Sequence, residues 1–283
     1  MTRPAASERR RERLPDGPEH DREEGALDRP RDPLPTRVSD LPPLSAEFDN
    51  VLEGGLAALG LALDAGARSA IDGHARMLLA WTAAINLTAI RDPAGVARLH
   101  VLDSLSAVPL LRAMGATALL DLGSGGGYPG LPLAAALGLD RVLLVDSIAK
   151  KVGFLRAVID ATALGSSVFA ERARAEDLAG AARDRGAWPV VTARAVGSLA
   201  ELAEVALPLV APGGVLIAWK RAPLDGELAA AAGALAALGA GGVTVIPAGV
   251  PGLDGHRLVV VPRAGPIDSR FPRDPAERRR RPL

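Results

Sequence analysis

Residues Thr117–Leu133 read T-A-L-L-D-L-G-S-G-G-G-Y-P-G-L-P-L, and this stretch decides the fold. Its first part, Ala118–Leu122, is a short apolar run, long enough for a buried β-strand and too short for a helix. Gly123, Gly125 and Gly127 follow at alternate positions, and a proline then opens an apolar segment suited to the first turns of a helix. Because glycine permits positive φ and close approach of a ligand, we predict a strand, a turn and a helix that cradle a nucleotide-like ligand.

The spacing of the glycines separates two ligand classes. A dinucleotide-binding turn reads G-x-G-x-x-G, whereas this turn reads D-x-G-x-G-x-G and begins at Asp121. A carboxylate at this point would repel a pyrophosphate and attract a ligand that carries an ammonium and a sulfonium group. The pattern therefore favours S-adenosylmethionine over NAD. The alternative is a tight strand-to-helix connection that binds no ligand.

Two more acidic positions follow predicted strands. The run Arg141–Val145 ends in Asp146, about 20 residues after the glycine turn, where an acid reaches ribose hydroxyls in a doubly wound fold. After the strand Val168–Ala170, Glu176 or Asp177 is placed either to accept from an adenine amino group or to complement a helix dipole. These positions extend the predicted S-adenosylmethionine site along one edge of the sheet.

The remaining strands complete an α/β pattern. Trp188–Ala193 ends at Arg194, which would lie at the carboxyl edge, either in the ligand site or in a salt bridge. Val215–Lys220 is the fifth strand, and Val243–Pro247 and His256–Pro262 form a hairpin with one antiparallel strand. Strands alternating with helices predict a Rossmann-like, mostly parallel seven-stranded sheet of the class I methyltransferase type.

We expect four regions along the chain. Residues 1–43 are rich in charge and proline and predict a disordered tail, whereas residues 44–115 have helical periodicity. Residues 116–262 form the methyltransferase core, and residues 263–283 a flexible basic tail. The run Arg278–Arg281 in that tail either contacts phosphate or is only solvated. In the helical region, His100, Asp103 and Ser104 form either a proton relay or a structural hydrogen bond.

Composition excludes several classes of protein. The 283 residues are 48% apolar, carry a formal net charge of +0 and include no cysteine. A chain without cysteine has no disulfide, thiolate metal site or cysteine nucleophile, and this fits a reducing cytoplasm. The N-terminus is too polar for a signal peptide, and prolines interrupt the uncharged stretch Leu228–Leu253. We expect a cytoplasmic protein with no membrane span and no metal.

The chain resembles the bacterial small-subunit rRNA guanine-N7 methyltransferases, also called glucose-inhibited division protein B. The resemblance covers about residue 46 to the C-terminus, and it departs from the family at the N-terminal tail and at Thr82, where the family usually has Asn. It rests on six blocks in one order: W-x-x-x-I-N-L-T-A-I-R-D-P (Trp81–Pro93), H-V-L-D-S-L (His100–Leu105), D-L-G-S-G-G-G-Y-P-G-L-P-L (Asp121–Leu133), V-D-S-I-A-K-K-V-G-F-L (Val145–Leu155), T-A-R-A (Thr192–Ala195) and the Pro/Arg-rich end Phe271–Leu283.

The resemblance implies an S-adenosylmethionine site and an RNA acceptor. Its donor contacts carry over to Gly123, Tyr128, Ala175, Glu176 and Arg194. The implied acceptor is N7 of a guanine in the decoding-region loop of 16S rRNA, either free or in a ribosomal particle, and loss of this methyl group in the family is associated with low-level streptomycin resistance. We expect a monomer in which Arg194 orients the methionine carboxylate or the guanine. The alternatives are another methyl acceptor, an NAD-dependent oxidoreductase and an RNA-binding module without activity.

Overall fold

The computed structural model describes residues 34–283. Of the predicted disordered tail, residues 1–33 lie outside the described residues. Its last ten positions do not fit that prediction, because Val38–Asp40 forms a 3-10 helix, η1, that packs against the first long helices. Trp81 Nε1 donates to the Pro35 carbonyl over 2.8 Å and Arg76 Nη2 donates to the Val38 carbonyl over 2.9 Å. These half-buried donors need acceptors, and the backbone of residues 34–43 supplies them.

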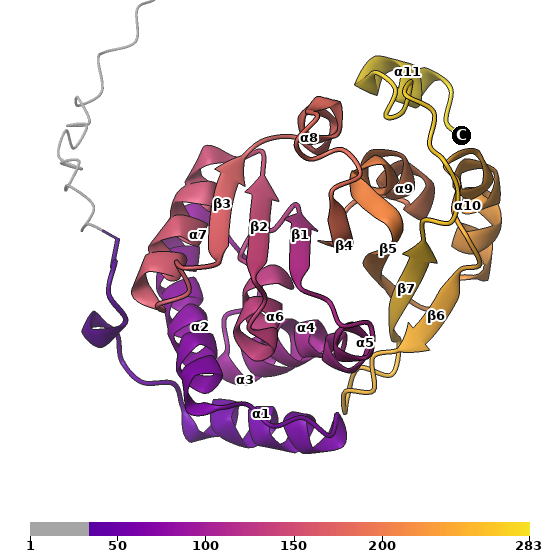
Figure 1. The fold of residues 1–283 in the computed structure, drawn as a ribbon. Helices are drawn as coiled ribbons and strands as arrows, with labels where there is room; N and C mark the ends of the chain where they lie inside the picture. The colour runs from indigo at the N-terminus through magenta and orange to yellow at the C-terminus, as the bar shows by residue number, and fades with distance from the viewer. Residues whose placement is uncertain (1–33) are drawn as a thin grey trace, which may run out of the picture. The chain divides into compact units, whose positions relative to one another are not determined.

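A seven-stranded sheet runs through the molecule in the order β3-β2-β1-β4-β5-β7-β6, as Figure 1 shows. Strand β7 is antiparallel to both of its neighbours, and the pairs from β3 to β5 are parallel. The predicted Rossmann-like fold with one antiparallel strand is therefore confirmed. The strands are β1 (Ala118–Leu122), β2 (Arg141–Asp146), β3 (Val168–Arg172), β4 (Trp188–Arg194), β5 (Val210–Arg221), β6 (Thr244–Pro247) and β7 (His256–Pro262).

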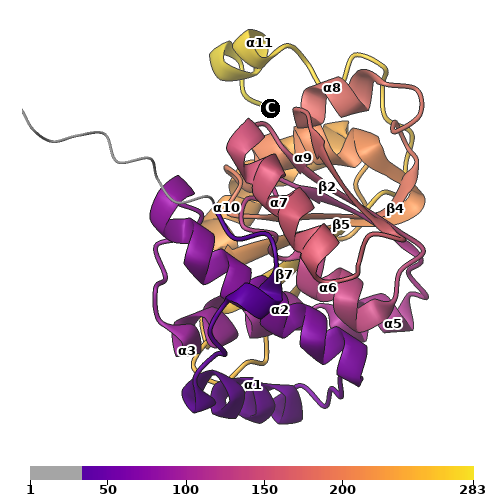
Figure 2. The same ribbon diagram turned by 90° about the vertical axis from the view of Figure 1, so that its left-hand side faces the viewer.

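Helices cover both faces of the sheet, and successive strand residues feed two separate apolar cores. Leu119 packs into the core under the N-terminal helices, whereas Leu120 packs into the core on the other face. The first core contains α1 (Ala46–Ala58), α2 (Ala65–Ile85), α3 (Pro93–Val96), the π-helical turn η2 (Ala97–Leu102), α4 (Asp103–Leu105), α5 (Val108–Ala113), α6 (Gly130–Leu137) and α7 (Ala149–Ala161) (Figure 2). The second contains α8 (Ala175–Gly180), α9 (Leu199–Ala206), η3 (Leu207–Leu209) and α10 (Asp225–Ala237).

Polar residues fix the ends of the N-terminal helices. The Ser45 side chain accepts from Phe48 N at the start of α1, and Asp64 Oδ1 accepts from Ala67 N over 2.7 Å at the start of α2. Helix α2 ends at Asn86, whose φ of 50° lies in the left-handed region. The following segment, Pro93–Ala113, is apolar enough to span a membrane by length and composition, but 67% of it is buried inside the fold. It is a core segment of this domain.

The C-terminal arm, which we define as Phe271–Leu283, is not the free end predicted from its charge. Phe271 is 1% exposed, and Arg273 Nε and Nη2 donate to the two carboxylate oxygens of Glu204, each over 2.7 Å. Glu204 on α9 is itself buried, so its charge requires a partner. Burial alone would raise the pKa of Glu204, but the hydrogen bonds from Arg273 outweigh that effect and lower it. The arm then forms a short helix, α11 (Pro275–Arg280).

Candidate functional site

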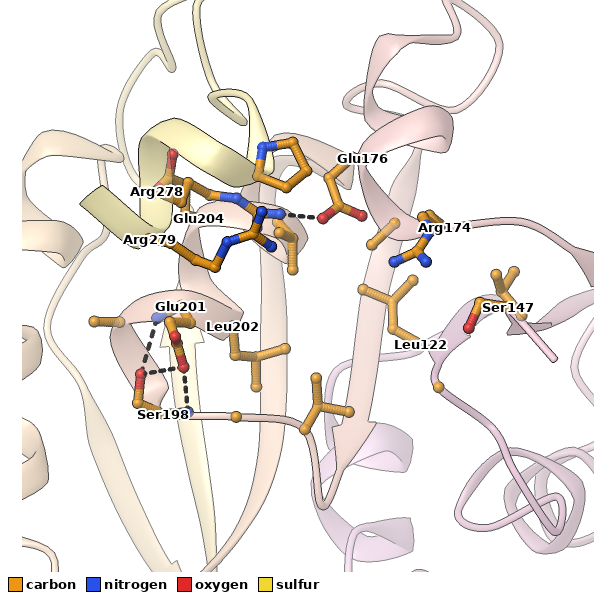
Figure 3. A pocket seen from close by; sticks show the side chains of 18 of the residues that line it. Leu122, Ser147, Arg174, Glu176, Ser198, Glu201, Leu202, Glu204, Arg278 and Arg279 are labelled. Carbon is orange, nitrogen blue, oxygen red and sulfur yellow. Dashed lines mark hydrogen bonds and ion pairs between the residues drawn. The ribbon is translucent and has the colours of Figure 1, made fainter. Parts of the chain in front are cut away.

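A cavity of about 730 Å³ lies at the carboxyl edge of the sheet (Figure 3). Its walls come from the ends of β1 and β2, the segments that lead into α8 and α9, and the C-terminal arm. This volume suits a nucleoside-sized ligand. The lining includes four of the predicted donor-site positions, Gly123, Asp146, Ala175 and Glu176. It does not include Gly125, Asp121, Tyr128 or Arg194.

The glycine turn contributes Gly123 to the cavity lining and is held by hydrogen bonds to β2. Gly123, Gly125 and Gly127 have φ values of 70°, 53° and 87°, which favour glycine. Gly123 N and Ser124 N both donate to the Val145 carbonyl, over 2.8 and 3.0 Å. A Cβ added at Gly127 would lie 2.4 Å from a Leu131 methyl carbon. The turn therefore presents bare main chain at Gly123, where a ligand can approach closely.

Asp146 is the carboxylate that joins this turn to the cavity. It is 6% exposed, and its Oδ2 accepts from Gly125 N over 3.0 Å while its Oδ1 accepts from Ile148 N over 2.9 Å. Lys151 Nζ lies 3.9 Å from Oδ2. Each carboxylate oxygen has two acceptor positions, so one on each remains for a ligand hydroxyl. This position agrees with the predicted ribose contact.

Asp121 is fully buried and faces away from the cavity. Its Oδ1 accepts from Thr192 Oγ1 over 2.8 Å, and its Oδ2 accepts from Gly130 N over 3.3 Å. Burial raises the pKa of Asp121 to about 6, although these hydrogen bonds oppose the shift. The side chain ties β1, β4 and α6 together. Asp121 therefore does not line the cavity, and a direct contact with a methyl donor stays a prediction.

Tyr128 and Arg194 also lie outside the cavity, in a buried polar layer between the sheet and the N-terminal helices. The Tyr128 ring stacks between His74 and His100, with centroid distances of 4.3 and 4.8 Å, and the Arg194 guanidinium lies 5.4 Å from its centroid. Burial raises the pKa of Tyr128. The expected wall of Tyr128 beside the donor is not present in this conformation, because the two histidines enclose the ring.

Arg194 forms the salt bridge that was the alternative to a ligand role. Its Nη1 donates to Asp103 Oδ2 over 3.2 Å and to the Leu99 carbonyl over 3.0 Å. Its Nη2 lies 3.1 Å from His100 Nδ1. Because a guanidinium only donates, His100 Nδ1 accepts, and its Nε2–H donates to Thr88 Oγ1 over 2.7 Å. Burial, with the nearby Arg194 charge second, lowers the pKa of His100 to about 3.

Of the two alternatives for His100, Asp103 and Ser104, the structure shows structural hydrogen bonds and no relay. Asp103 Oδ1 pairs with His256 Nδ1 over 2.9 Å, and its other oxygen holds Arg194. Ser104 Oγ donates to the His100 carbonyl over 2.6 Å, which is a structural contact within the helix. His74 Nε2 contacts the Gly126 carbonyl over 2.7 Å, and burial lowers the pKa of His74 to about 4. This layer holds the back of the glycine turn, and His256 Nε2 is buried in it without a hydrogen-bond partner among residues 34–283.

Sequence reasoning missed the part of the C-terminal arm that reaches the cavity. Arg278 and Arg279 line it, and Arg278 Nη2 is ion-paired with Glu176 Oε1 (Figure 3). The only signal was the Pro/Arg-rich block, whose charge indicates a solvated end equally well. Among residues 34–283, no group of three or more His, Asp or Glu side chains is arranged to hold a metal ion.

Comparison with known proteins matches the chain to one family of methyltransferases. A family model described as rRNA small subunit methyltransferase G, GidB, matches residues 68–248. The ribosomal RNA small subunit methyltransferase G of Roseiflexus sp. (strain RS-1) is 38% identical over 226 residues, which cover 80% of this chain and 96% of that protein. The protein of the same name from Sorangium cellulosum (strain So ce56) is 44% identical over 177 residues, covering 62% of this chain and 73% of that protein.

One solved structure supports the fold. The crystal structure of an O-methyltransferase from Bacillus cereus, titled as a complex with SAH, superposes with a TM-score of 0.51 at 18% sequence identity. The likeness covers 76% of this chain and 99% of that chain. It concerns the arrangement of strands and helices, which is the one described above.

Proposed function

Because this chain belongs to the rRNA small subunit methyltransferase G family, we propose that it transfers a methyl group from S-adenosylmethionine to N7 of a guanine in the decoding-region loop of 16S rRNA. The observation that carries the proposal is the cavity at the carboxyl edge, bounded by the bare main chain of Gly123 and by the carboxylates of Asp146 and Glu176. Its acceptors match the hydroxyl and amino donors of an adenosine.

The donor would be held at three points of this cavity. Asp146 accepts from the ribose hydroxyls with the acceptor positions that the backbone leaves free. Glu176 accepts from the adenine amino group, and Ala175 and Gly123 contact the donor with main chain. Asp121 and Gly125 act indirectly, since Asp121 ties the strands and Gly125 fixes the Asp146 carboxylate through its N–H.

Arg194 and Tyr128 do not line the donor cavity in this structure. Both lie beyond the glycine turn, in the layer under the N-terminal helices, and Arg194 retains 17% exposure of its side chain. The resemblance assigns Arg194 a donor contact, which would require its guanidinium to turn from Asp103 toward the methionine carboxylate. We therefore keep Arg194 as the residue that orients the methionine carboxylate or the guanine.

The reaction needs no general base from the protein. Guanine N7 is an unprotonated acceptor, so its lone pair forms the N–CH₃ bond directly as the S–CH₃ bond breaks. The donor supplies a methyl group activated by the positive sulfur. The chain's own contribution is to align the two reactants and to exclude water. Burial lowers the pKa values of His74 and His100, so both imidazoles are neutral at pH 7, and the proposed reaction takes no proton from or to them.

Methyl transfer to isolated rRNA tests the proposal. Purified protein is incubated with S-adenosylmethionine labelled in its methyl group and with small ribosomal subunits, their assembly intermediates or free 16S rRNA from an unmethylated strain. We expect one labelled guanine in the decoding-region loop, located by chain cleavage at N7-methylguanine. Label in protein or a small molecule, with none in rRNA, would replace the RNA acceptor by the alternative. We place the reaction in the cytoplasm and expect a monomer.

A further inference from the structure

The contact between Arg278 and Glu176 joins the last helix of the chain to the cavity wall. Arg278 Nη2 pairs with Glu176 Oε1 across 102 positions of sequence, and the two side chains are 15% and 23% exposed. In Figure 3 the Arg278 side chain extends from α11 to the Glu176 carboxylate, and Arg279 reaches the same cavity. An ion pair this far withdrawn from water is more strongly coupled than a surface pair.

The arm is held in place without this contact. Arg273 binds both oxygens of Glu204, and its Nη1 also donates to the Arg281 carbonyl at the end of α11, over 2.8 Å. Arg185 Nη1 donates to the Phe271 carbonyl over 2.7 Å. Arg278 is therefore presented to the cavity by a fixed support, and its loss should leave the arm seated.

Glu176 keeps half of its carboxylate free. The ion pair uses Oε1, and Oε2 accepts no hydrogen bond from any residue in the described range 34–283. Glu176 lies at the start of α8, a helix of six residues, so an unpaired glutamate here would sample several rotamers. With Oε1 held by Arg278, the orientation of Oε2 is fixed before a ligand arrives.

We propose that Arg278 is a positioning residue for the methyl donor: it holds Glu176 so that Oε2 accepts from the exocyclic amino group of adenine. The inference rests on the proposed donor role of Glu176 and names a second residue, distant in sequence, on which that role depends. Through Arg278, the C-terminal arm would also help the site to select adenine over a purine that has a carbonyl oxygen in place of the amino group. Such a purine would place an acceptor opposite Oε2.

Calorimetric binding of S-adenosylhomocysteine tests the inference, with S-inosylhomocysteine as the analogue that lacks the amino group. We expect Arg278→Gln to weaken S-adenosylhomocysteine binding about tenfold and to leave the binding of the inosyl analogue within about twofold. Arg280→Gln is the matched control, since Arg280 lies on the same helix, is exposed and does not line the cavity. It should bind both ligands as the wild type does.

A double-mutant cycle distinguishes positioning from a general effect of charge. If Arg278 acts through Glu176, Arg278→Gln has no further effect in a Glu176→Gln background. An unchanged affinity in Arg278→Gln, or the same loss with and without Glu176, overturns the proposal.

Arg278→Lys, which keeps the charge and loses the planar fork, should recover part of the affinity, so the test stands even where the glutamine variant melts early. Donor affinity does not depend on the acceptor. If the calorimetric results are as expected and the protein methylates no rRNA, only the proposed function is contradicted.

Discussion

Two aspartates at neighbouring strand ends have opposite roles, and their surroundings explain why. Asp121 is buried, and each of its carboxylate oxygens accepts a hydrogen bond from another residue. Burial raises its pKa to about 6. Asp146 is bonded to two backbone N–H groups but lines the cavity. Carboxylates with similar sequence signatures thus divide into one that joins strands and one that faces the cavity.

Replacing Asp146 by Asn should weaken S-adenosylhomocysteine binding by about tenfold or more, because a hydrogen bond to a charged group contributes about 1.5–3 kcal/mol. Isothermal titration calorimetry measures the change. Asp160→Asn, at an exposed position of α7, is the matched control and should bind as the wild type does. An Asp146 variant with wild-type affinity would remove this residue from the donor site.

Replacing Asp121 by Asn should lower the stability of the protein and leave the affinity for S-adenosylhomocysteine nearly unchanged. If its amide N–H faces Gly130 N, a buried donor is left unsatisfied; if it faces Thr192 Oγ1, the hydroxyl must accept and turn its proton to the Leu120 carbonyl, 3.5 Å away, so we expect a cost of about 1–3 kcal/mol. Urea unfolding should show this loss of stability. Donor affinity, measured at a temperature where the variant is folded, should stay within about threefold. A large loss of affinity with unchanged stability would return Asp121 to a direct ligand role.

The glycine turn contributes Gly123 to the cavity lining, and its other glycines have different requirements. At Gly125 an added Cβ would meet nothing nearer than a backbone oxygen at 3.8 Å, so only its φ of 53° demands glycine. At Gly127 the φ of 87° is combined with close contacts to Leu131 and His74. The turn is therefore constrained by packing at its helix end and by backbone conformation at its centre.

Replacing Gly127 by Ala should destabilise the protein by about 3 kcal/mol, the sum of a positive-φ penalty and an overpacking penalty. Urea denaturation followed by circular dichroism measures the change. Gly153→Ala on α7 is the control, because its Cβ would meet nothing within 4 Å and alanine favours a helix by up to about 1 kcal/mol. Equal stabilities of the two variants would contradict the described turn.

At the scale of the whole molecule, buried imidazoles make stability depend on pH. Burial lowers the pKa of His74 to about 4 and of His100 to about 3, from a value near 6.5 in the unfolded chain. Between pH 6.5 and these values the unfolded chain binds more protons, so stability falls as pH falls. From pH 7 to pH 5 each imidazole costs about 2 kcal/mol, and the raised pKa of Asp121 offsets about 1 kcal/mol.

This prediction is checked by urea unfolding at pH 7 and pH 5. The wild type should lose about 2–3 kcal/mol over this interval from these three groups. The variant His100→Gln, which cannot take up the proton, should show a loss smaller by about 2 kcal/mol even if it is less stable at pH 7. Parallel pH profiles for the two proteins would show that His100 is not buried as a neutral base.

The fold and half of the site were predictable from the sequence. Strand-length apolar runs, the glycine turn and alternating helices determine the parallel sheet, and hydrophobic periodicity locates α1 and α2. Spacing to the strands predicts Asp146 and leaves Glu176 and Asp177 as alternatives, of which the family resemblance selects Glu176; Asp146 and Glu176 both line the cavity.

The rest depended on contacts that spacing does not encode. Tyr128 sits inside the glycine turn in sequence, but two histidines from the N-terminal helices enclose it. A run of four arginines has the composition of a solvated tail. The ion pairs of Arg278 with Glu176 and of Arg273 with the buried Glu204 make the arm a wall of the cavity. Long-range ion pairs of this kind have no local signal.

A crystal structure of this protein with S-adenosylhomocysteine tests the central claim most directly. The account predicts the adenosine in the cavity at the carboxyl edge, with its ribose hydroxyls on Asp146, its amino group on Glu176 and its homocysteine over Gly123. An empty cavity with the ligand bound elsewhere, or an adenosine that contacts neither carboxylate, would contradict it.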